Sequence, residues 1–229
     1  MIIGAGMIGS AFAHHYKDSN DILIFASGVS DSTCVDPIKF AREKRLLTDV
    51  IAKYKDVKYF IYFSTCSIYD ALLTAQPYVI HKKSMEKIVF LHPRGQVIRL
   101  PQVAGLHAPP NTLLASIKNK ILSDEEVLVW RSAFRNIVDL EDVLSIVDFY
   151  IRNNKFPCKD LNIANTHYYS AEQIVVTMGA LLNRRVKMTF VDKGSFYRID
   201  ASHIEKILNL LGICFDSNYL ERVVKRYYL

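Results

Sequence analysis

The apolar residues of this 229-residue chain fall into short continuous runs, separated by longer segments with helical periodicity. Ile22–Ala26 and Tyr59–Phe63 have the length of strands that are buried on both faces of a parallel sheet. Asp36–Lys55 and Tyr78–Leu91 have the length and spacing of helices, and the first opens on an Asp-Pro pair that is typical of a helix start. The alternation predicts an α/β fold with a parallel, doubly wound sheet.

The remaining elements extend this pattern and then become less regular. A strand is expected at Ile2–Ile3, followed by a helix to about Tyr16, and another strand at Gln96–Leu100. In the last third, the pattern predicts an extended segment at Arg135–Asp139, strands at Asp160–Ala164 and Val186–Val191, and helices at Glu141–Arg152, Ser170–Leu182, Ala201–Leu211 and Asn218–Tyr227. We expect a single domain over residues 1–229, in which about 106–134 and 165–229 form a small C-terminal α+β cap.

Composition excludes several classes of protein. Half of the residues are hydrophobic and 11% are aromatic, which excludes disorder. No apolar run approaches the ~20 residues that span a bilayer, so we expect no membrane insertion. No secretory signal is visible at the start, and the four cysteines have no paired spacing, so we expect a cytoplasmic location and no metal site. The net charge is 29 − 23 = +6, but its lysines and arginines are scattered, and we expect no nucleic acid partner.

Gly4-x-Gly6-x-x-Gly9 lies between the first strand and the first helix. Such glycines permit a tight turn, close approach of a pyrophosphate and packing of helix on strand, and the helix N-terminus offers free amides. This predicts a Rossmann-like dinucleotide site. The residues expected to bind the cofactor there are Gly4, Gly6, Met7, Ile8 and Gly9, with Ala26, Ser27 and Gly28 after the next strand.

The carboxylate that normally grips the adenosine ribose is missing. The strand after the glycine loop ends in Phe25-Ala26-Ser27-Gly28, and Asp31 lies three residues deeper in the loop. The choice between NAD and NADP therefore stays open.

A tyrosine and a lysine four residues apart open the helix at Tyr78. Tyr78 and Lys82 share one helix face, and a lysine ammonium close to a phenol is expected to lower the phenol's pKa, which would make Tyr78 an acid or base for a carbinol. Thr65 ends the buried strand just upstream, where ligands bind in parallel sheets. Its hydroxyl is expected to bind a substrate oxygen.

These motifs together resemble the extended short-chain dehydrogenases/reductases, in the NAD-dependent epimerase/dehydratase branch that modifies nucleotide sugars. The resemblance runs through most of the chain in the right order. It is carried by the glycine loop, Ser64-Thr65-Cys66-Ser67-Ile68-Tyr69, Tyr78-Val79-Ile80-His81-Lys82, Ile98–Gly105, Arg135–Val143, and Asn162-Ile163-Ala164 with Ser170-Ala171-Glu172.

The resemblance implies roles for individual residues. Thr65, Tyr78 and Lys82 would be catalytic, with Tyr78 as the acid/base and Lys82 on the nicotinamide ribose. Pro101 would join Tyr78 and Lys82 in binding the cofactor, and Thr65, Ser67, Gln102 and Arg135 would bind the substrate. For Arg135 the alternative is a surface salt bridge to Glu141 or Asp142. His81 and Cys66 are interpreted as packed side chains, and Asp139 and Asp142 as part of a capped helix start.

The chain also departs from the family in three places. One β-α-β stretch appears deleted before the Thr65 strand, so that Ile22–Ala26 corresponds to a later strand of the family; the alternative is that it is the ordinary second strand and the deletion falls later. Only 13 residues separate Thr65 from Tyr78, and Gln102 replaces an Asn. Cys66 and Ser67 stand where sugar dehydratases carry Asp-Glu, which disfavours dehydration.

The resulting hypothesis is an NAD(P)-dependent reductase of a keto sugar nucleotide, with Tyr78 as acid. A C4 epimerase is the alternative within the enzyme class, and a non-catalytic dinucleotide sensor or scaffold is the alternative of another class. The resemblance further implies polysaccharide biosynthesis and a possible homodimer. Its seam would use Ile80, Ser84, Ile88 and Leu91.

Overall fold

The computed structural model describes all residues 1–229 and confirms the α/β fold with a parallel sheet. Five strands form this sheet in the order β1-β2-β3-β4-β9, and every pair in it is parallel. The strands are β1 (Ile2–Ile3), β2 (Ile22–Phe25), β3 (Tyr59–Thr65), β4 (Gly95–Leu100) and β9 (Asp160–Asn162). Their carboxyl ends lie along one edge, where the predicted site residues gather.

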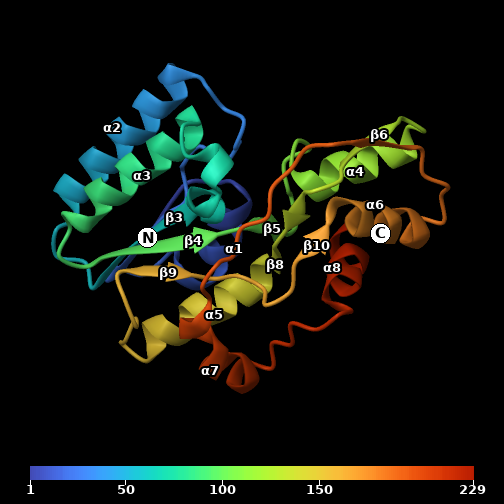
Figure 1. Ribbon diagram of the computed structural model, residues 1–229. Helices are drawn as coiled ribbons and strands as arrows, with labels where there is room; N and C mark the ends of the chain where they lie inside the picture. The colour runs from blue at the N-terminus through green and yellow to red at the C-terminus, as the bar shows by residue number, and fades with distance from the viewer.

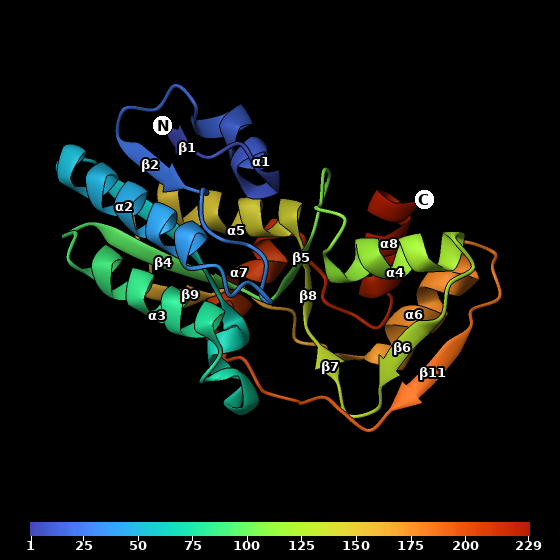
Figure 2. The same cartoon turned by 90° about the horizontal axis from the view of Figure 1, so that it is seen from above.

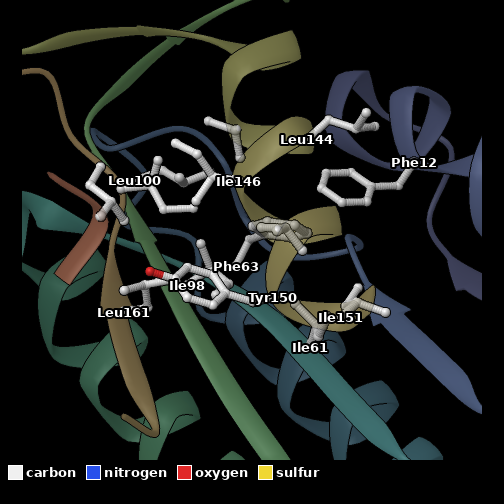
Figure 3. Packing of buried hydrophobic residues seen from close by; sticks show 14 of the residues in the cluster. Phe12, Ile61, Phe63, Ile98, Leu100, Leu144, Ile146, Tyr150, Ile151 and Leu161 are labelled. Carbon is white, nitrogen blue, oxygen red and sulfur yellow. The ribbon is translucent and has the colours of Figure 1, made fainter. Parts of the chain in front are cut away.

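Helices cover both faces of the sheet, as Figures 1 and 2 show. One face carries α1 (Met7–Tyr16), α5 (Leu140–Arg152) and α7 (Ser202–Leu211), and the other carries α2 (Pro37–Lys53) and α3 (Pro77–Phe90). Successive strand residues supply opposite faces, so Ile24 packs with α1 and α5 while Leu23 packs with α2 and α3. Figure 3 shows the first of these two cores, with Phe12 beside Phe63 and α5.

Local sequence explains where the helices begin. The Asp36 side chain accepts from the Ile38 amide at 2.8 Å, directly before Pro37 at the start of α2. Asp139 caps α5 in the same way through the Glu141 amide at 2.9 Å, which agrees with the capped start expected there. Ser170 and Gln173 form a reciprocal capping box at α6 (Ala171–Leu181).

The strand order decides which strands are missing. In the classic order 3-2-1-4-5-6, strands 2 and 3 lie outside strand 1, and strand 4 lies on its other side. Here β1 forms the edge, and the Thr65 strand β3 is a neighbour of β2 rather than of β1. β2 therefore takes the place of strand 4, which confirms that Ile22–Ala26 corresponds to the family's later strand.

The β1-α1-β2 crossover has an unusual hand. β1 to β2 and β2 to β3 are steps in the same direction across the sheet, yet α1 and α2 lie on opposite faces. The two crossovers therefore have opposite hands, although about 98% of such connections are right-handed. In the classic order the first helix leads outward to strand 2, and α1 packs on the face that such a helix would take.

The C-terminal part adds a second apolar core. It is built from α4 (Leu113–Leu122), α6 and α8 (Tyr219–Tyr228), which bury Leu114, Met178 and Val224 among others. Three two-stranded ladders accompany it: β5 (Gln102–Ala104) with β8 (Ile137–Asp139), β6 (Val127–Trp130) with β11 (Met188–Val191), and β7 (Phe134–Arg135) with β10 (Tyr169–Ser170).

The sequence pattern did not predict α4, β5 or β6, because each is short and gains its stability from contacts with distant segments. Conversely, α7 lies within the range expected for the cap but packs in the sheet core through Ile204, Ile207 and Leu208. The division into domain and substrate cap stays a prediction.

Two further expectations concern surfaces. On α3, Ile80 and Leu91 are exposed and Ser84 lies on the surface, whereas Ile88 is half-buried against the core. The homodimer seam stays a prediction. None of the helices combines the length with the apolar character that crossing a membrane requires.

The packing of α1 on the sheet can be tested through its contribution to stability. Phe12 is fully buried and its ring packs at a tilt against Phe63, with 5.3 Å between ring centroids, so Phe12→Ala should lower the free energy of unfolding by about 3–5 kcal/mol. Urea denaturation followed by circular dichroism measures this change. Leu91→Ala, at a side chain that is 81% exposed, is the control and should leave stability unchanged. Equal effects of the two variants would show that α1 does not pack on the sheet.

Candidate active site

The three glycines of the glycine loop, Gly4, Gly6 and Gly9, differ in what surrounds them. Gly4 has φ +119° and lies against Ala26, whose carbonyl oxygen would be 2.4 Å from a side-chain Cβ. Gly9 faces the Gly4 carbonyl oxygen, 2.3 Å from where its own Cβ would be. Gly6 differs from both, because a Cβ there would meet no atom within 4 Å. The fold requires Gly4 and Gly9, whereas Gly6 faces open space beside the N-terminus of α1.

The loop after β2 lies next to the glycine loop. The Ala26 amide donates to the Ile3 carbonyl at 2.8 Å, which joins the two loops at the carboxyl edge of the sheet. The chain then leaves β1 towards one face and β2 towards the other, an arrangement that favours a ligand crevice between the two loops. The predicted phosphate-binding and ribose-binding segments thus come together, and we expect the dinucleotide to bind here.

Thr65 and Tyr78 meet at the end of β3. Thr65 is the last residue of the strand, its hydroxyl accepts from the Ser67 amide at 3.1 Å, and it also hydrogen-bonds the Tyr78 phenol. Tyr78 lies in the first turn of α3, packed against Val29 and Val79. Both side chains are buried, so the hydroxyl pair is shielded from bulk water.

The expectation of a lowered tyrosine pKa is wrong. Burial raises the pKa of Tyr78, the hydrogen bond with Thr65 opposes this only in part, and the negative charge of Glu43 raises it further. Lys82 does not counter this, because its ammonium is paired with a carboxylate of its own. Tyr78 is therefore a neutral phenol at physiological pH.

That carboxylate belongs to Glu43, in the second turn of α2. It is fully buried, and Oε1 accepts from Tyr62 at 2.6 Å and from Lys82 at 3.2 Å. Oε2 accepts from the Val29 amide at 2.6 Å and faces His81 Nε2 at 2.9 Å. Burial alone would raise the pKa of Glu43, but these partners lower it to about 2. No motif in the sequence distinguishes Glu43 from the other charged residues of α2.

His81 and Cys66 have structural surroundings. The His81 ring stacks on Phe40 at 4.5 Å between centroids while it faces Glu43. Cys66 is fully buried beside Ala164 and Ile199, and burial raises the pKa of its thiol well above the ordinary value. Both agree with the interpretation as packed side chains.

The expected substrate residues lie on the cap side of Thr65. Gln102 opens β5, its amide donating to the Asn136 carbonyl at 3.1 Å, next to the half-buried Arg135. Arg135 forms no ion pair with Glu141 or Asp142; its guanidinium donates to the Phe134 carbonyl at 2.9 Å. The salt-bridge alternative is therefore wrong, and Arg135 keeps its remaining donors free for a ligand.

Tyr197, which the sequence analysis did not single out, also lies near the expected substrate residues. The segment 192–200 runs from β11 past β7 and past two short 3-10 helices, Cys66–Tyr69 and Ala71–Leu73, to α7 (Figure 2). Ser195 in it bonds Asp70, and Tyr197 hydrogen-bonds Ser67. Burial raises the pKa of the Tyr197 phenol, and the positive charge of Arg135 opposes this. Tyr197 is thus a neighbour of the predicted substrate residues Ser67 and Arg135. Its signal is tertiary, because nearly 120 residues separate it from Tyr78.

The fold and this geometry agree with a sequence comparison. The profile of the NAD dependent epimerase/dehydratase family matches residues 26–164, which is more than half of the chain. The chain belongs to this family. The match begins at Ala26, in the loop after β2, and so leaves out the glycine loop and β2 itself. No curated protein matches the chain by sequence.

Solved structures show the same fold at low sequence identity. UDP-glucuronic acid 4-epimerase from Bacillus cereus aligns over 91% of this chain and 74% of its own, with TM-score 0.72 and 15% identity. MoeE5, solved with UDP-glucose and NAD, aligns over 97% and 95%, with TM-score 0.74 and 14% identity. dTDP-glucose 4,6-dehydratase from Bacillus anthracis str. Ames aligns over 96% and 77%, with TM-score 0.69 and 16% identity. These likenesses confirm the Rossmann-like fold of the extended short-chain dehydrogenases/reductases.

Gly6 offers a direct test of the dinucleotide crevice. Because a Cβ there meets no protein atom, Gly6→Ala should leave the free energy of unfolding unchanged but weaken NADH binding by roughly 10-fold or more, since the methyl group takes the space that a pyrophosphate needs. Fluorescence titration with NADH and urea denaturation measure the two effects.

Gly9→Ala is the matched control, because its Cβ collides with the Gly4 carbonyl and should destabilise the protein itself. Unchanged NADH affinity in Gly6→Ala would contradict the proposed phosphate site.

Proposed function

We propose that the protein is an NAD(P)-dependent oxidoreductase that reduces a keto group of a nucleotide-activated sugar. The observation that carries this proposal is the hydroxyl pair Thr65–Tyr78, buried at the carboxyl edge of the sheet beside the dinucleotide crevice. Family membership supports this class of substrate and cofactor, as do similar solved structures that hold UDP-glucuronic acid or UDP-glucose together with NAD.

The protonation state of Tyr78 supports reduction rather than oxidation. A neutral, buried phenol is ready to donate a proton to the oxygen of a ketone as it becomes a hydroxyl. Thr65 would hold that oxygen by a second hydrogen bond, which fixes the carbonyl beside the donor. When bound, the reduced cofactor would supply the hydride; the chain's own contribution is to orient the carbonyl, protonate its oxygen and exclude water.

Dehydration is not supported by the residues after Thr65. Elimination of water needs a proton acceptor and a proton donor near the sugar. Cys66 is a fully buried thiol with a raised pKa, and Ser67 has only a neutral hydroxyl, so neither residue can fill these roles. Asp70, the nearest carboxylate along the chain, is buried and accepts from the Leu72 amide and Ser195. It is committed to holding the segment 192–200 in place.

The cap side offers what a nucleotide diphosphate requires. Arg135 has guanidinium donors beyond its bond to the Phe134 carbonyl, and these would suit a diphosphate; Tyr197, which hydrogen-bonds Ser67, lies near it. We propose that Tyr197 contacts the sugar and replaces the lid that the short Thr65–Tyr78 connection cannot form.

The missing strands favour a cofactor that exchanges. Strands 2 and 3 of the classic order support the adenosine half of a dinucleotide, and neither they nor an acidic residue after β2 is present. We therefore expect weak or unselective binding of the adenosine end. A reductase must release its oxidised cofactor in each cycle, whereas a C4 epimerase, the second candidate, must retain it.

Tyr78→Phe tests the acid. It removes only the hydroxyl, so reduction of a keto sugar nucleotide should fall by about 10²–10⁴-fold, whereas NADH affinity should fall by less than about 10-fold because only one expected cofactor contact is lost. Turnover of a panel of keto and parent nucleotide sugars, with NADH and with NADPH, measures this. Tyr59→Phe, at a tyrosine in the distant start of β3, is the control.

Several outcomes of this panel would revise the proposal. Interconversion of parent sugars without added cofactor would favour the epimerase. Cofactor binding without turnover by wild type or variant would favour the sensor or scaffold.

The pH dependence of turnover tests the neutral phenol. Tyr78 must be protonated to act as acid, and its pKa lies above the ordinary 10.0, so activity is present at all lower pH values and is lost only as the pH rises past that value. The turnover number at saturating NADH should therefore stay level from neutral pH to pH 10. If the turnover number of the wild type instead declines from near neutral pH, and the residual turnover of Tyr78→Phe shows no such decline, the pKa of Tyr78 is lowered.

A further inference from the structure

We propose that Glu43 is the positioning residue of the nicotinamide end: its carboxylate fixes the Lys82 ammonium and the Gly28 loop in one arrangement, which the dinucleotide then binds. The inference rests on the proposed function. It concerns a residue on α2, a helix that supplies none of the residues implied by the family resemblance.

The carboxylate joins three elements that form one side of the crevice. Oε2 accepts from the Val29 amide, which belongs to the loop after β2. Oε1 accepts from Tyr62 on β3 and from Lys82 on α3. Because Glu43 itself extends from α2, a single side chain fixes the distances between strand, loop and catalytic helix.

Lys82 is left with one donor to offer. Of its three N–H groups, one points to Glu43 and another to the Tyr62 hydroxyl at 3.0 Å. The ammonium lies directly against Gly28, since a Cβ on that residue would be 2.7 Å from Nζ and 2.8 Å from Glu43 Oε1. Gly28 thus lacks a side chain where the pair needs the space, and the third donor lies beneath the loop expected to contact the ribose.

Charge is the essential property of Glu43. Lys82 is 3% exposed, so burial lowers the pKa of its ammonium, and Glu43 is the main group that opposes this. The other groups that face Lys82 are Tyr62 from β3, which burial keeps neutral, and Glu86 from its own helix, which acts through space and is already paired with Arg99. Without Glu43, the ammonium would have no carboxylate in contact.

Two substitutions separate charge from shape. Glu43→Gln keeps the size and loses the charge, while Glu43→Asp keeps the charge and loses one methylene. Positioning by charge predicts that Glu43→Gln weakens NADH binding by roughly 10- to 100-fold, and that Glu43→Asp weakens it less. If Glu43 served only to fill space, the order would be reversed, and that result would overturn the inference.

The pH dependence of binding adds a readout that packing alone would not change. In Glu43→Gln the unpaired Lys82 loses its proton at lower pH, so NADH affinity should fall with rising pH earlier than in the wild type, and Glu43→Asp should restore the wild-type profile. Glu86→Gln removes another buried carboxylate, on the same helix as Lys82, and measures how far the loss of a buried carboxylate by itself lowers the stability of the protein. It should lower stability without reproducing the shifted pH profile.

A comparison in the Lys82→Met background covers the case in which Glu43→Gln does not fold. Lys82→Met and the double variant Glu43→Gln/Lys82→Met both lack the buried ammonium. If Glu43 acts through Lys82, the double variant should bind NADH as Lys82→Met does; a further loss of NADH affinity in the double variant would overturn the inference. The wild type separates this from the proposed function: no NADH binding by the wild type refutes the function, whereas normal binding by Glu43→Gln refutes only the role of Glu43.

Discussion

Two neighbouring parallel strands send the chain to opposite faces of the sheet, and the rest of the molecule is arranged around this divergence. α1 leaves β1 towards the face of α5, and α2 leaves β2 towards the face of α3. In a sheet whose strand order reverses, the reversal itself produces such a crevice. Here the order runs without reversal, and the opposite hand of the α1 crossover produces the crevice instead. The predicted site therefore lies at the carboxyl edge of a sheet that lacks strands 2 and 3 of the classic order.

Buried carboxylates beside the five-stranded sheet are each neutralised by a cation. Two carboxylates without access to water, Glu43 and Glu86, each meet a cation and at least one hydroxyl, so neither remains an uncompensated charge. Glu86 accepts from Ser64 and Arg99 and ties α3 to β3 and β4, while Glu43 ties α3 to α2. The helix that carries Tyr78 is therefore held from both sides by ionic contacts. This fixes the phenol relative to Thr65, and it also removes the free cation that would have turned Tyr78 into a phenolate.

Much of the fold could be predicted from the sequence because its signals are local. Continuous apolar runs marked β2 and β3, an Asp-Pro pair marked α2, and a glycine spacing marked the crevice. The pairing of Lys82 could not be predicted, because helical spacing places Lys82 near Tyr78 but is silent about a carboxylate 39 residues earlier. Short elements such as α4 and β6 were missed for a related reason, since their apolar residues find partners only in α6 and β11.

The segment 192–200 has a consequence beyond closing the substrate side. It is a single extended strap whose two ends belong to different cores: it leaves β11, which pairs with β6 in the cap, and enters α7, which packs on the sheet. Its backbone is held by Phe134, Asn162 and Tyr168 rather than by regular secondary structure. Its exposed side chains, such as Phe196 and Arg198, can therefore vary without disturbing either core or the proton donor, whereas the buried Ile199 is held beside Cys66. A chain built in this way can acquire a new sugar preference by changes in one exposed connection, while the machinery for hydride and proton transfer stays as it is.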